Sequence, residues 1–485
     1  MPQRAAEADS APSDVLRKRT ASSTLVSIAG QVAAQVLRLG GNLVLAHLLF
    51  PEAFGLMALV NLVMWTLQAI SDVGINAAIV RHARDDDRFV DTAWTLQVVR
   101  GVVLWLFGVA LAHPIARFYG EPELASLVPA AAFSALLLGF GSTKVVTLTR
   151  NIAPGRVVAI EVGSQGIALV VTVWLAWSFR SVWALVAGGL VATAVRTLAS
   201  HALVPGRGNR FAWDASAARE LIEFGRWVTL STTFNFLAFR MDLALVGVLL
   251  PVETVGVYSI GVILSNVVRE VLAQINRLVV LPTLSAAVRA GPDTLPDGIL
   301  RLRSSILPTA LTGTIAAVTL APALFTGLYD ERYHDAAWIA QLSMLAVWFS
   351  FLCDVSGTAL LAIGDSRSWA ISTAVKALLT LVACLAGHRL GGVPGLIVGG
   401  AAAALGTYGL ASWQLAHHRV HVLRGDAPYT LAALALGALG AGLPHLAAPG
   451  APPRVQAAWS LAISAALLAP LAFWALRRLR AGAGL

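Results

Sequence analysis

The feature that most constrains this chain is a series of apolar runs, each long enough to cross a bilayer, that recur from about residue 20 to the end. A transmembrane helix needs about 20 consecutive apolar residues. Short breaks rich in arginine or proline separate the runs. Because lipid cannot hydrogen-bond to exposed backbone groups, such runs cross a membrane as helices. The sequence therefore predicts an all-α integral membrane protein.

Composition supports the same conclusion. Hydrophobic residues make up 57% of the chain and charged residues 13%, with a mean hydropathy of +0.74. A soluble domain with so little charge could not cover its surface with polar groups. The formal charge of +9 could suggest nucleic acid, but the basic residues lie in breaks between apolar runs, with no basic helix or aromatic platform. We therefore exclude nucleic acid as a partner.

Windows of about 20 residues give about fourteen transmembrane helices, among them spans near 336–362, 369–388 and 393–416. No apolar core with a cleavage site precedes the first of them, so no removable signal peptide is expected. The expected organisation is a cytoplasmic tail at 1–20, a six-helix bundle at 21–203, a cytoplasmic linker at 204–226, a second six-helix bundle at 227–417, two extra helices at 430–476 and a tail at 477–485.

Loop charge predicts the orientation. With the N-terminus in the cytoplasm, the cytoplasmic segments hold about 21 basic residues and the outer loops about 5, a strong positive-inside bias. The cytoplasmic set includes Arg289, Arg301 and Arg303, which precede a predicted span at 305–327. We expect a multi-pass protein of the bacterial inner membrane with both termini in the cytoplasm.

The two six-helix blocks resemble each other. The break Leu49–Gly55 recurs as Leu249–Gly256, and Val182–Gly189 is echoed by Val393–Gly400. An even number of spans in each block gives both blocks the same orientation. The sequence thus predicts two parallel repeats plus two C-terminal helices that have no counterpart, with a substrate site where the repeats meet.

Polar residues at intervals of three or four form stripes on the first two helices of each block. A charge at the bilayer centre costs about 2.5–3.5 kcal/mol, so the stripes should face a wet cavity. Arginines would make this cavity cationic and suited to phosphate. The candidate substrate-binding residues are Gln31, Gln35, Arg38, Asn76, Arg100, Asn235, Arg240, Arg269, Asn276 and Arg277.

Simpler explanations exist for single members of these stripes. Arg38 and Arg277 could extend to lipid headgroups near helix ends. Asp72 and Asp242 are candidates for ion coupling, as proton or sodium sites, or are carboxylates at helix ends. The sequence contains no Gly-rich phosphate loop, no metal motif and no Ser/His/Asp array. We therefore expect no catalytic residues, no cofactor and no metal, and a transporter rather than an enzyme.

Several motifs are similar to those of one transporter family. They include Leu45–Gly55, Ser71–Gly74, Ile115–Leu124 and Ile275-Asn276-Arg277 running to Pro282. On these motifs, residues 20–420 resemble the polysaccharide exporters of the multidrug/oligosaccharidyl-lipid/polysaccharide superfamily, the lipid-linked oligosaccharide flippases. The chain departs from the family pattern at Gln97 and Arg100, where members often carry asparagine or an apolar residue.

The resemblance implies export of an undecaprenyl-diphosphate-linked oligosaccharide, a precursor of lipopolysaccharide or exopolysaccharide, by alternating access coupled to an ion gradient. It implies as partners the lipid-linked oligosaccharide, membrane lipids, and polysaccharide polymerase or assembly proteins. Two alternatives remain open. An ion-coupled, multidrug-type antiporter is less compatible with a cationic cavity, and an oligosaccharide polymerase or ligase needs a large outer loop, whereas every predicted outer loop is short.

Overall fold

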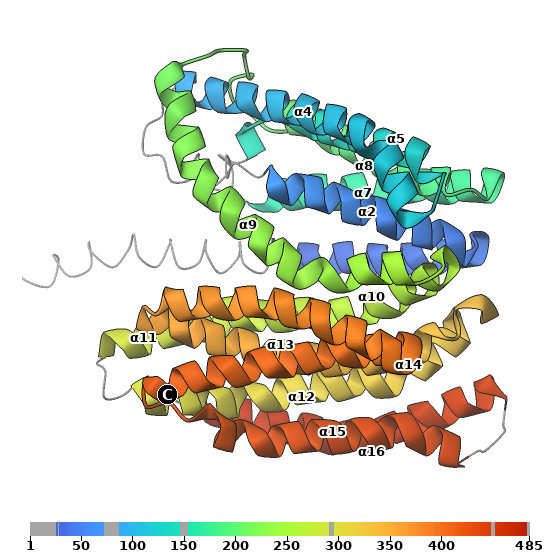
Figure 1. Cartoon of the computed structure of the whole chain (residues 1–485), viewed down its shortest axis with the longest axis vertical. Helices are drawn as coiled ribbons and strands as arrows, with labels where there is room; N and C mark the ends of the chain where they lie inside the picture. Colours follow the sequence, from blue (N-terminus) through green and yellow to red (C-terminus); the bar gives the residue numbers. More distant parts are fainter. Residues whose placement is uncertain are drawn as a thin grey trace, which may run out of the picture. The chain divides into compact units, whose positions relative to one another are not determined.

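A computed structural model of the protein describes residues 26–27, 29–71, 87–145, 154–290, 295–447 and 452–482 (Figure 1). Within these residues the structure is helical and contains no strand. Ten helices of the described part are long and apolar enough to cross a membrane. The predicted fold class, an all-α integral membrane protein, is confirmed.

The chain divides into two compact units. Unit 1 comprises Met1–Leu49 and Leu56–Thr233, and unit 2 comprises Phe50–Gly55 and Phe234–Leu485. The helices of unit 1 are residues 29–48, α2 (Pro51–Ile70, whose first turn belongs to unit 2), α4 (Asp87–Tyr119), α5 (Leu124–Gly139), α7 (Pro154–Phe179), α8 (Trp183–Ala202) and the first part of α9 (Ala215–Leu249).

Small residues let the helices of unit 1 approach closely. A Cβ atom on Gly101 of α4 would lie 2.7 Å from the carbonyl oxygen of Ala135 on α5, and a Cβ on Gly108 would meet Ala132. Membrane helices commonly pack through such positions, because lipid gives no hydrophobic force between helices and close contact must supply the attraction. The α4–α5 pair forms one side of a polar cavity described below.

Unit 2 contains the rest of α9 and a long series of helices. They are α10 (Val252–Ile275), a π-helical turn at Asn276–Val280, α11 (Leu281–Ala290), α12 (Leu295–Leu328), a short 3₁₀ turn at Glu331–Tyr333, α13 (Ala336–Ile363), α14 (Ser366–His417), α15 (Val422–Ala447) and α16 (Pro453–Gly482). The backbone is non-helical at Gly391 and Gly392 inside α14, and Gly392 has a φ of +59°. The two spans predicted at 369–388 and 393–416 are the two arms of this kinked helix.

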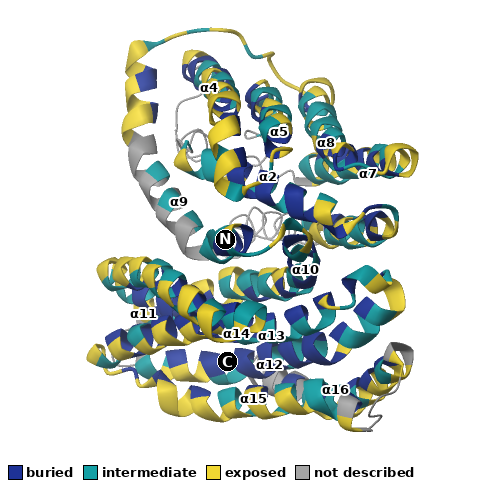
Figure 2. Ribbon diagram, turned by 45° about the vertical axis from the view of Figure 1, so that its right-hand side comes forward, coloured by how far each residue is buried: buried dark blue, intermediate teal, exposed yellow. Residues whose placement is uncertain are grey.

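The core of unit 2 lies around α13. Its side chains, among them Trp348 and Leu352, pack against α12, α14 and α15. Figure 2 shows α12 and α13 largely buried and much of α15 exposed. The exposed surface is apolar, as lipid contact requires; examples on α15 are Leu431, Leu434 and Leu439.

The two breaks that suggested an internal repeat contact each other in unit 2. A Cβ atom on Gly55 would overlap the carbonyl oxygen of Val252, and one on Gly256 would overlap that of Pro51. Each glycine therefore receives the backbone at the start of the other helix. The contact is reciprocal: Gly55 and Gly256 each lack the Cβ atom that would block it.

Two helices begin earlier than hydropathy indicated. α9 begins at Ala215, inside the predicted linker, because the Asp214 carboxylate accepts hydrogen bonds from the backbone N–H groups of Ser216 (2.8 Å) and Ala217 (3.2 Å) and so caps its first turn. α12 begins at Leu295, so Arg303, which was expected in the segment before the span at 305–327, is a buried residue inside the helix. Hydropathy finds the apolar part of a helix, not its polar first turns.

Candidate functional site

Polar residues of α9 and α10 form a cluster inside unit 2. Arg240 and Asp242 lie one turn or less apart on α9, and Asp242 and Arg269 are the charges that act most strongly on Arg240. The Tyr258 hydroxyl lies 3.4 Å from a carboxylate oxygen of Asp242, to which it donates. The structure therefore brings three of the predicted site residues, Arg240, Asp242 and Arg269, into one electrostatic group.

The helix that carries Arg269 changes its winding near the other predicted residues. The turn Asn276–Val280 is π-helical, and the N–H of Leu281 donates to the carbonyl of Asn276. Pro282 follows directly; it has no N–H, and its ring crowds the carbonyl four residues before it. A wider turn relieves this crowding. Such π turns are frequent at functional sites.

A hydrogen-bonded pair attaches the π turn to α13. The Asn276 side-chain amide donates to the Thr358 hydroxyl (2.9 Å), and that hydroxyl also lies 3.1 Å from the amide oxygen. Because the pair joins two membrane-spanning helices, it fixes where Asn276 sits. This anchoring gives Asn276 a structural role besides the predicted substrate contact.

Arg269 and Asn276 line a small crevice between α10 and α13, opposite Ser350, Phe351 and Asp354. Its volume of about 10 Å³ holds about one water molecule. The Arg269 Nε atom is buried and has no hydrogen-bond partner. A buried guanidinium N–H without an acceptor is costly, so this atom is available to a bound water or anion.

Asp354 belongs to this cluster and was not among the predicted residues. Lys376 of α14 and Arg269 of α10 are the charges that act on its carboxylate. Lys376 is 8% exposed. The available signal was a single acidic residue inside the apolar span 336–362, since an ionisable residue within a membrane span is a functional candidate by default.

Arg277 forms an ion pair with Glu270 in the same helix. An Nη atom of Arg277 lies 2.9 Å from a carboxylate oxygen of Glu270, and each side chain is 58% exposed. A separation of seven residues places the two side chains on one face, two turns apart. Sequence reasoning had paired Glu270 with no residue.

Apart from Arg100, the remaining predicted residues lie on the helix of residues 29–48, on α9 or outside the described part. Gln31 and Arg38 are exposed and Gln35 is half-buried. The backbone of Asn235 is helical, and the structure does not describe its side chain. Asp72 and Asn76 lie outside the described residues.

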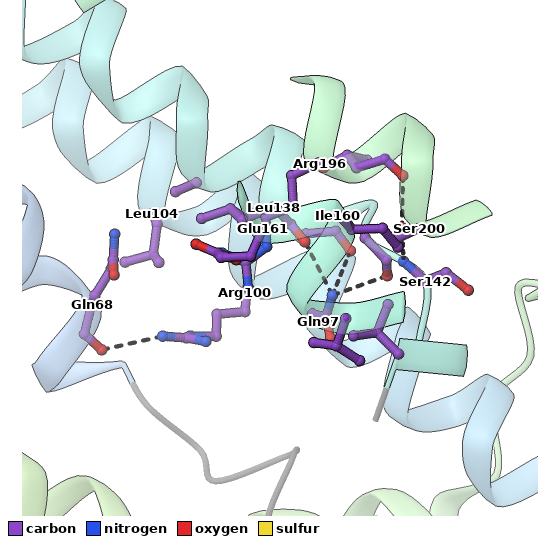
Figure 3. A pocket seen from close by; sticks show the side chains of 17 residues that line it. Gln68, Gln97, Arg100, Leu104, Leu138, Ser142, Ile160, Glu161, Arg196 and Ser200 are labelled. Atoms are coloured by element: carbon purple, nitrogen blue, oxygen red, sulfur yellow. Dashed lines mark hydrogen bonds and ion pairs between the residues drawn. The ribbon is translucent and has the colours of Figure 1, made fainter. Parts of the chain in front are cut away.

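Arg100 lines a separate polar cavity within unit 1 (Figure 3). The cavity has a volume of about 350 Å³ and lies among α2, α4, α5, α7 and α8. Two more charged side chains line it, Glu161 and Arg196, whose carboxylate and guanidinium are 3.2 Å apart. They are 38% and 49% exposed. Ionisable side chains within membrane spans usually face the bundle interior or a polar cavity, and this pair faces such a cavity.

Both departures from the family pattern on α4 cap the ends of other helices. Arg100 donates to the Gln68 carbonyl (3.2 Å) and the Ser71 hydroxyl (3.1 Å) at the end of α2. The Gln97 amide donates to the carbonyls of Leu138 (3.1 Å) and Gly139 (3.2 Å) at the end of α5. A 16-residue helix is about 24 Å long, shorter than the roughly 30 Å hydrocarbon core of a bilayer, so the carbonyls at its end need donors from the protein.

The sequence also matches a known family. The family model described as "Polysaccharide biosynthesis protein" matches residues 44–336, more than half of the chain. This chain belongs to the polysaccharide biosynthesis protein family. The resemblance inferred from the sequence motifs is thereby confirmed at the level of the family.

Two curated relatives of this family member are 22% and 24% identical to it. The teichuronic acid biosynthesis protein TuaB of Bacillus subtilis aligns over 307 residues, 61% of this chain and 62% of its own length. The succinoglycan biosynthesis transport protein ExoT of Rhizobium meliloti aligns over 282 residues, 58% and 55%. The chain thus spans less than two thirds of either relative.

Solved structures share the fold of this family member. The lipid II flippase MurJ in an inward closed conformation superposes with a TM-score of 0.72 over 94% of this chain and 99% of its own, at 11% identity. An inward-facing multidrug resistance transporter of the MATE family gives 0.64 over 79% and 95%, at 15% identity. At these identities the likeness establishes the fold alone.

Proposed function

We propose that this protein exports a lipid-linked oligosaccharide, the precursor of a surface polysaccharide, across the inner membrane of a bacterium. Family membership supports this function, as do the names of similar proteins: ExoT is a succinoglycan transport protein and MurJ a lipid II flippase. The MATE likeness also fits a multidrug antiporter. The arginines of the unit 2 cluster favour an anionic substrate over an organic cation.

The observation that carries the proposal is the polar face of α10. Arg269 presents a buried N–H without an acceptor, and Arg277 is exposed on the π turn that follows. A diphosphate offers several acceptor oxygens at fixed negative charge, and the planar guanidinium binds such groups through two parallel hydrogen bonds. Arg269 and Arg277 are therefore the residues we assign to the diphosphate.

The helix of residues 29–48 and Asp242 of α9 complete the proposed site. Gln31, Gln35 and Arg38 would contact the glycan or the diphosphate from the helix of residues 29–48. Asp242 would couple transport to an ion, since an ionised carboxylate carries several oxygen lone pairs that can hold a cation. The lipid tail stays in the bilayer, so the protein shields only the polar headgroup. Both termini would lie in the cytoplasm.

Complementation in the host bacterium tests the proposal. We expect a deletion strain to lose its surface polysaccharide and to accumulate lipid-linked oligosaccharide in the inner leaflet. Wild-type protein and Arg389→Ala should restore export, because Arg389 is exposed on α14 and is not among the residues assigned to the substrate. Arg277→Ala should accumulate to the same protein level and fail. Full export by Arg277→Ala would remove Arg277 from the site.

A further inference from the structure

Two arginines of the unit 2 cluster, Arg240 and Arg269, each lie near a carboxylate that also interacts with another side chain. Asp242 acts on Arg240 and accepts from the Tyr258 hydroxyl. The positive charges of Lys376 on α14 and Arg269 on α10 both act on the Asp354 carboxylate. A carboxylate that interacts with side chains of two other helices helps to hold those helices together. Neither Asp242 nor Asp354 can leave its arginine without breaking a second interaction.

Glu270 differs from these two carboxylates. Within the described residues its partner is Arg277, through one contact of 2.9 Å between a single Nη atom and a single carboxylate oxygen. Both residues belong to one continuous helical segment, so their separation does not tie two helices together. Both side chains are 58% exposed and are therefore accessible to a ligand. Glu270 is the carboxylate that can be displaced at the lowest cost.

We propose that Glu270 is an exchangeable counter-ion: it occupies Arg277 in the empty transporter, and the substrate diphosphate displaces it. The inference rests on the proposed function. A diphosphate can bind the guanidinium through two hydrogen bonds and carries more charge than a carboxylate, so it competes successfully for Arg277. After the substrate leaves, Glu270 binds Arg277 again.

The exchange of Glu270 for the diphosphate affects the step in which the empty transporter changes conformation. An empty transporter must change conformation to accept the next substrate, and an unpaired guanidinium in a membrane span opposes any step that removes it from water. Glu270 neutralises Arg277 during that step. It therefore weakens substrate binding and accelerates the return of the empty protein, and these two effects are separable by kinetics.

The test compares Glu270→Gln with wild type and with Glu253→Gln, a matched control near the start of the same helix whose carboxylate is also exposed. Binding of undecaprenyl diphosphate, a headgroup probe without sugar, is measured on detergent-purified protein, and flipping of the oligosaccharide-bearing lipid is measured in vesicles. An exposed ion pair contributes about 0.2–1 kcal/mol, so we expect Glu270→Gln to lower the dissociation constant about 1.4- to fivefold. Its maximal flipping rate should fall, and Glu253→Gln should match wild type.

Two further variants separate this role from a purely structural one. Glu270→Asp keeps the charge on a shorter side chain and should give intermediate values. In an Arg277→Ala background, Glu270→Gln should have no effect on binding, because the partner is gone. Unchanged or weaker binding by Glu270→Gln, or tighter binding that persists without Arg277, would overturn the inference. Wild-type protein that fails to bind the probe would contradict the proposed diphosphate site itself.

Discussion

The guanidinium of Arg303 and the carboxylate of Asp426 form an ion pair inside the core of unit 2, where each side chain is only 2% exposed. Arg303 Nε donates to one carboxylate oxygen at 3.0 Å and an Nη atom donates to the other. The Tyr408 hydroxyl also donates to Asp426 (2.6 Å), and Arg303 donates to the Ser356 hydroxyl (3.2 Å). This network joins α12, α13, α14 and α15.

Breaking the pair should destabilise unit 2 strongly. Removal of one partner of a buried ion pair typically costs about 3–5 kcal/mol, because it leaves an uncompensated buried charge. We therefore expect Asp426→Ala to lower the midpoint of thermal unfolding in detergent markedly. Asp297→Asn, an exposed position at the start of α12, serves as the control. Equal midpoints for Asp426→Ala and wild type would show that the pair contributes nothing to the fold.

Replacing both partners should be far milder than replacing one. The double variant Arg303→Met/Asp426→Leu removes both charges together and fills their space with apolar groups, which is often neutral or stabilising by about 1–4 kcal/mol. We expect its unfolding midpoint to lie above that of Asp426→Ala and near that of wild type. A midpoint as low as that of Asp426→Ala would mean that the hydrogen bonds to Tyr408 and Ser356, rather than the opposite charges, stabilise this region.

The turn between α13 and α14 should contribute stability that depends on pH. Hydrogen bonds from Ser368 and then His418 lower the pKa of Asp365 to about 2. Because the folded pKa lies below the ordinary value of 3.8, the contribution is complete above about pH 4 and is lost as the pH falls through 2. We expect wild type to unfold at a higher temperature than Asp365→Asn at pH 7, with the gap closing between pH 4 and pH 2. A gap that does not change with pH would contradict this assignment.

The reciprocal glycine contact in unit 2 should tolerate no side chain. At Gly256 an added Cβ would overlap backbone atoms of Pro51, which cannot rotate away as a side chain could. Overpacking of this kind typically costs about 1–3 kcal/mol, so Gly256→Ala should unfold at a lower temperature than wild type. Gly163→Ala in α7, where a Cβ would meet no atom within 4 Å, is the control and should unfold no earlier. Equal unfolding of the two variants would argue against close helix approach.

Hydropathy predicted much of this fold, because every membrane span must be apolar over about 20 residues. The apolar centres of the helices were found, and the separation of the spans at 369–388 and 393–416 agrees with the kink at Gly391 and Gly392. The polar first turns of α9 and α12 were missed, because neither turn shows apolar periodicity. The first turn of α9 is capped by Asp214 instead.

The site could be predicted only in part, because many of its contacts join residues that are far apart in the sequence. Arg303 and Asp426 are separated by 123 residues, so no local pattern indicates that they meet. The stripes drew attention to polar residues of α9 and α10 but indicated no carboxylate partner for Arg269 or Arg277. Asp354 reaches Arg269 from another helix, and the Glu270–Arg277 pair required side-chain directions that spacing alone does not give.

Export of a lipid-linked oligosaccharide by this protein can be observed as flipping in vesicles that contain only the purified protein. Undecaprenyl-diphosphate oligosaccharide is placed in one leaflet, and the sugar that an added glycosidase can reach is followed over time for wild type, Arg277→Ala and Arg389→Ala. We expect wild type and Arg389→Ala to move the lipid-linked oligosaccharide between leaflets and Arg277→Ala to lose this activity. Rates in all three that equal those of protein-free vesicles, with and without proton or sodium gradients, would contradict the proposed function.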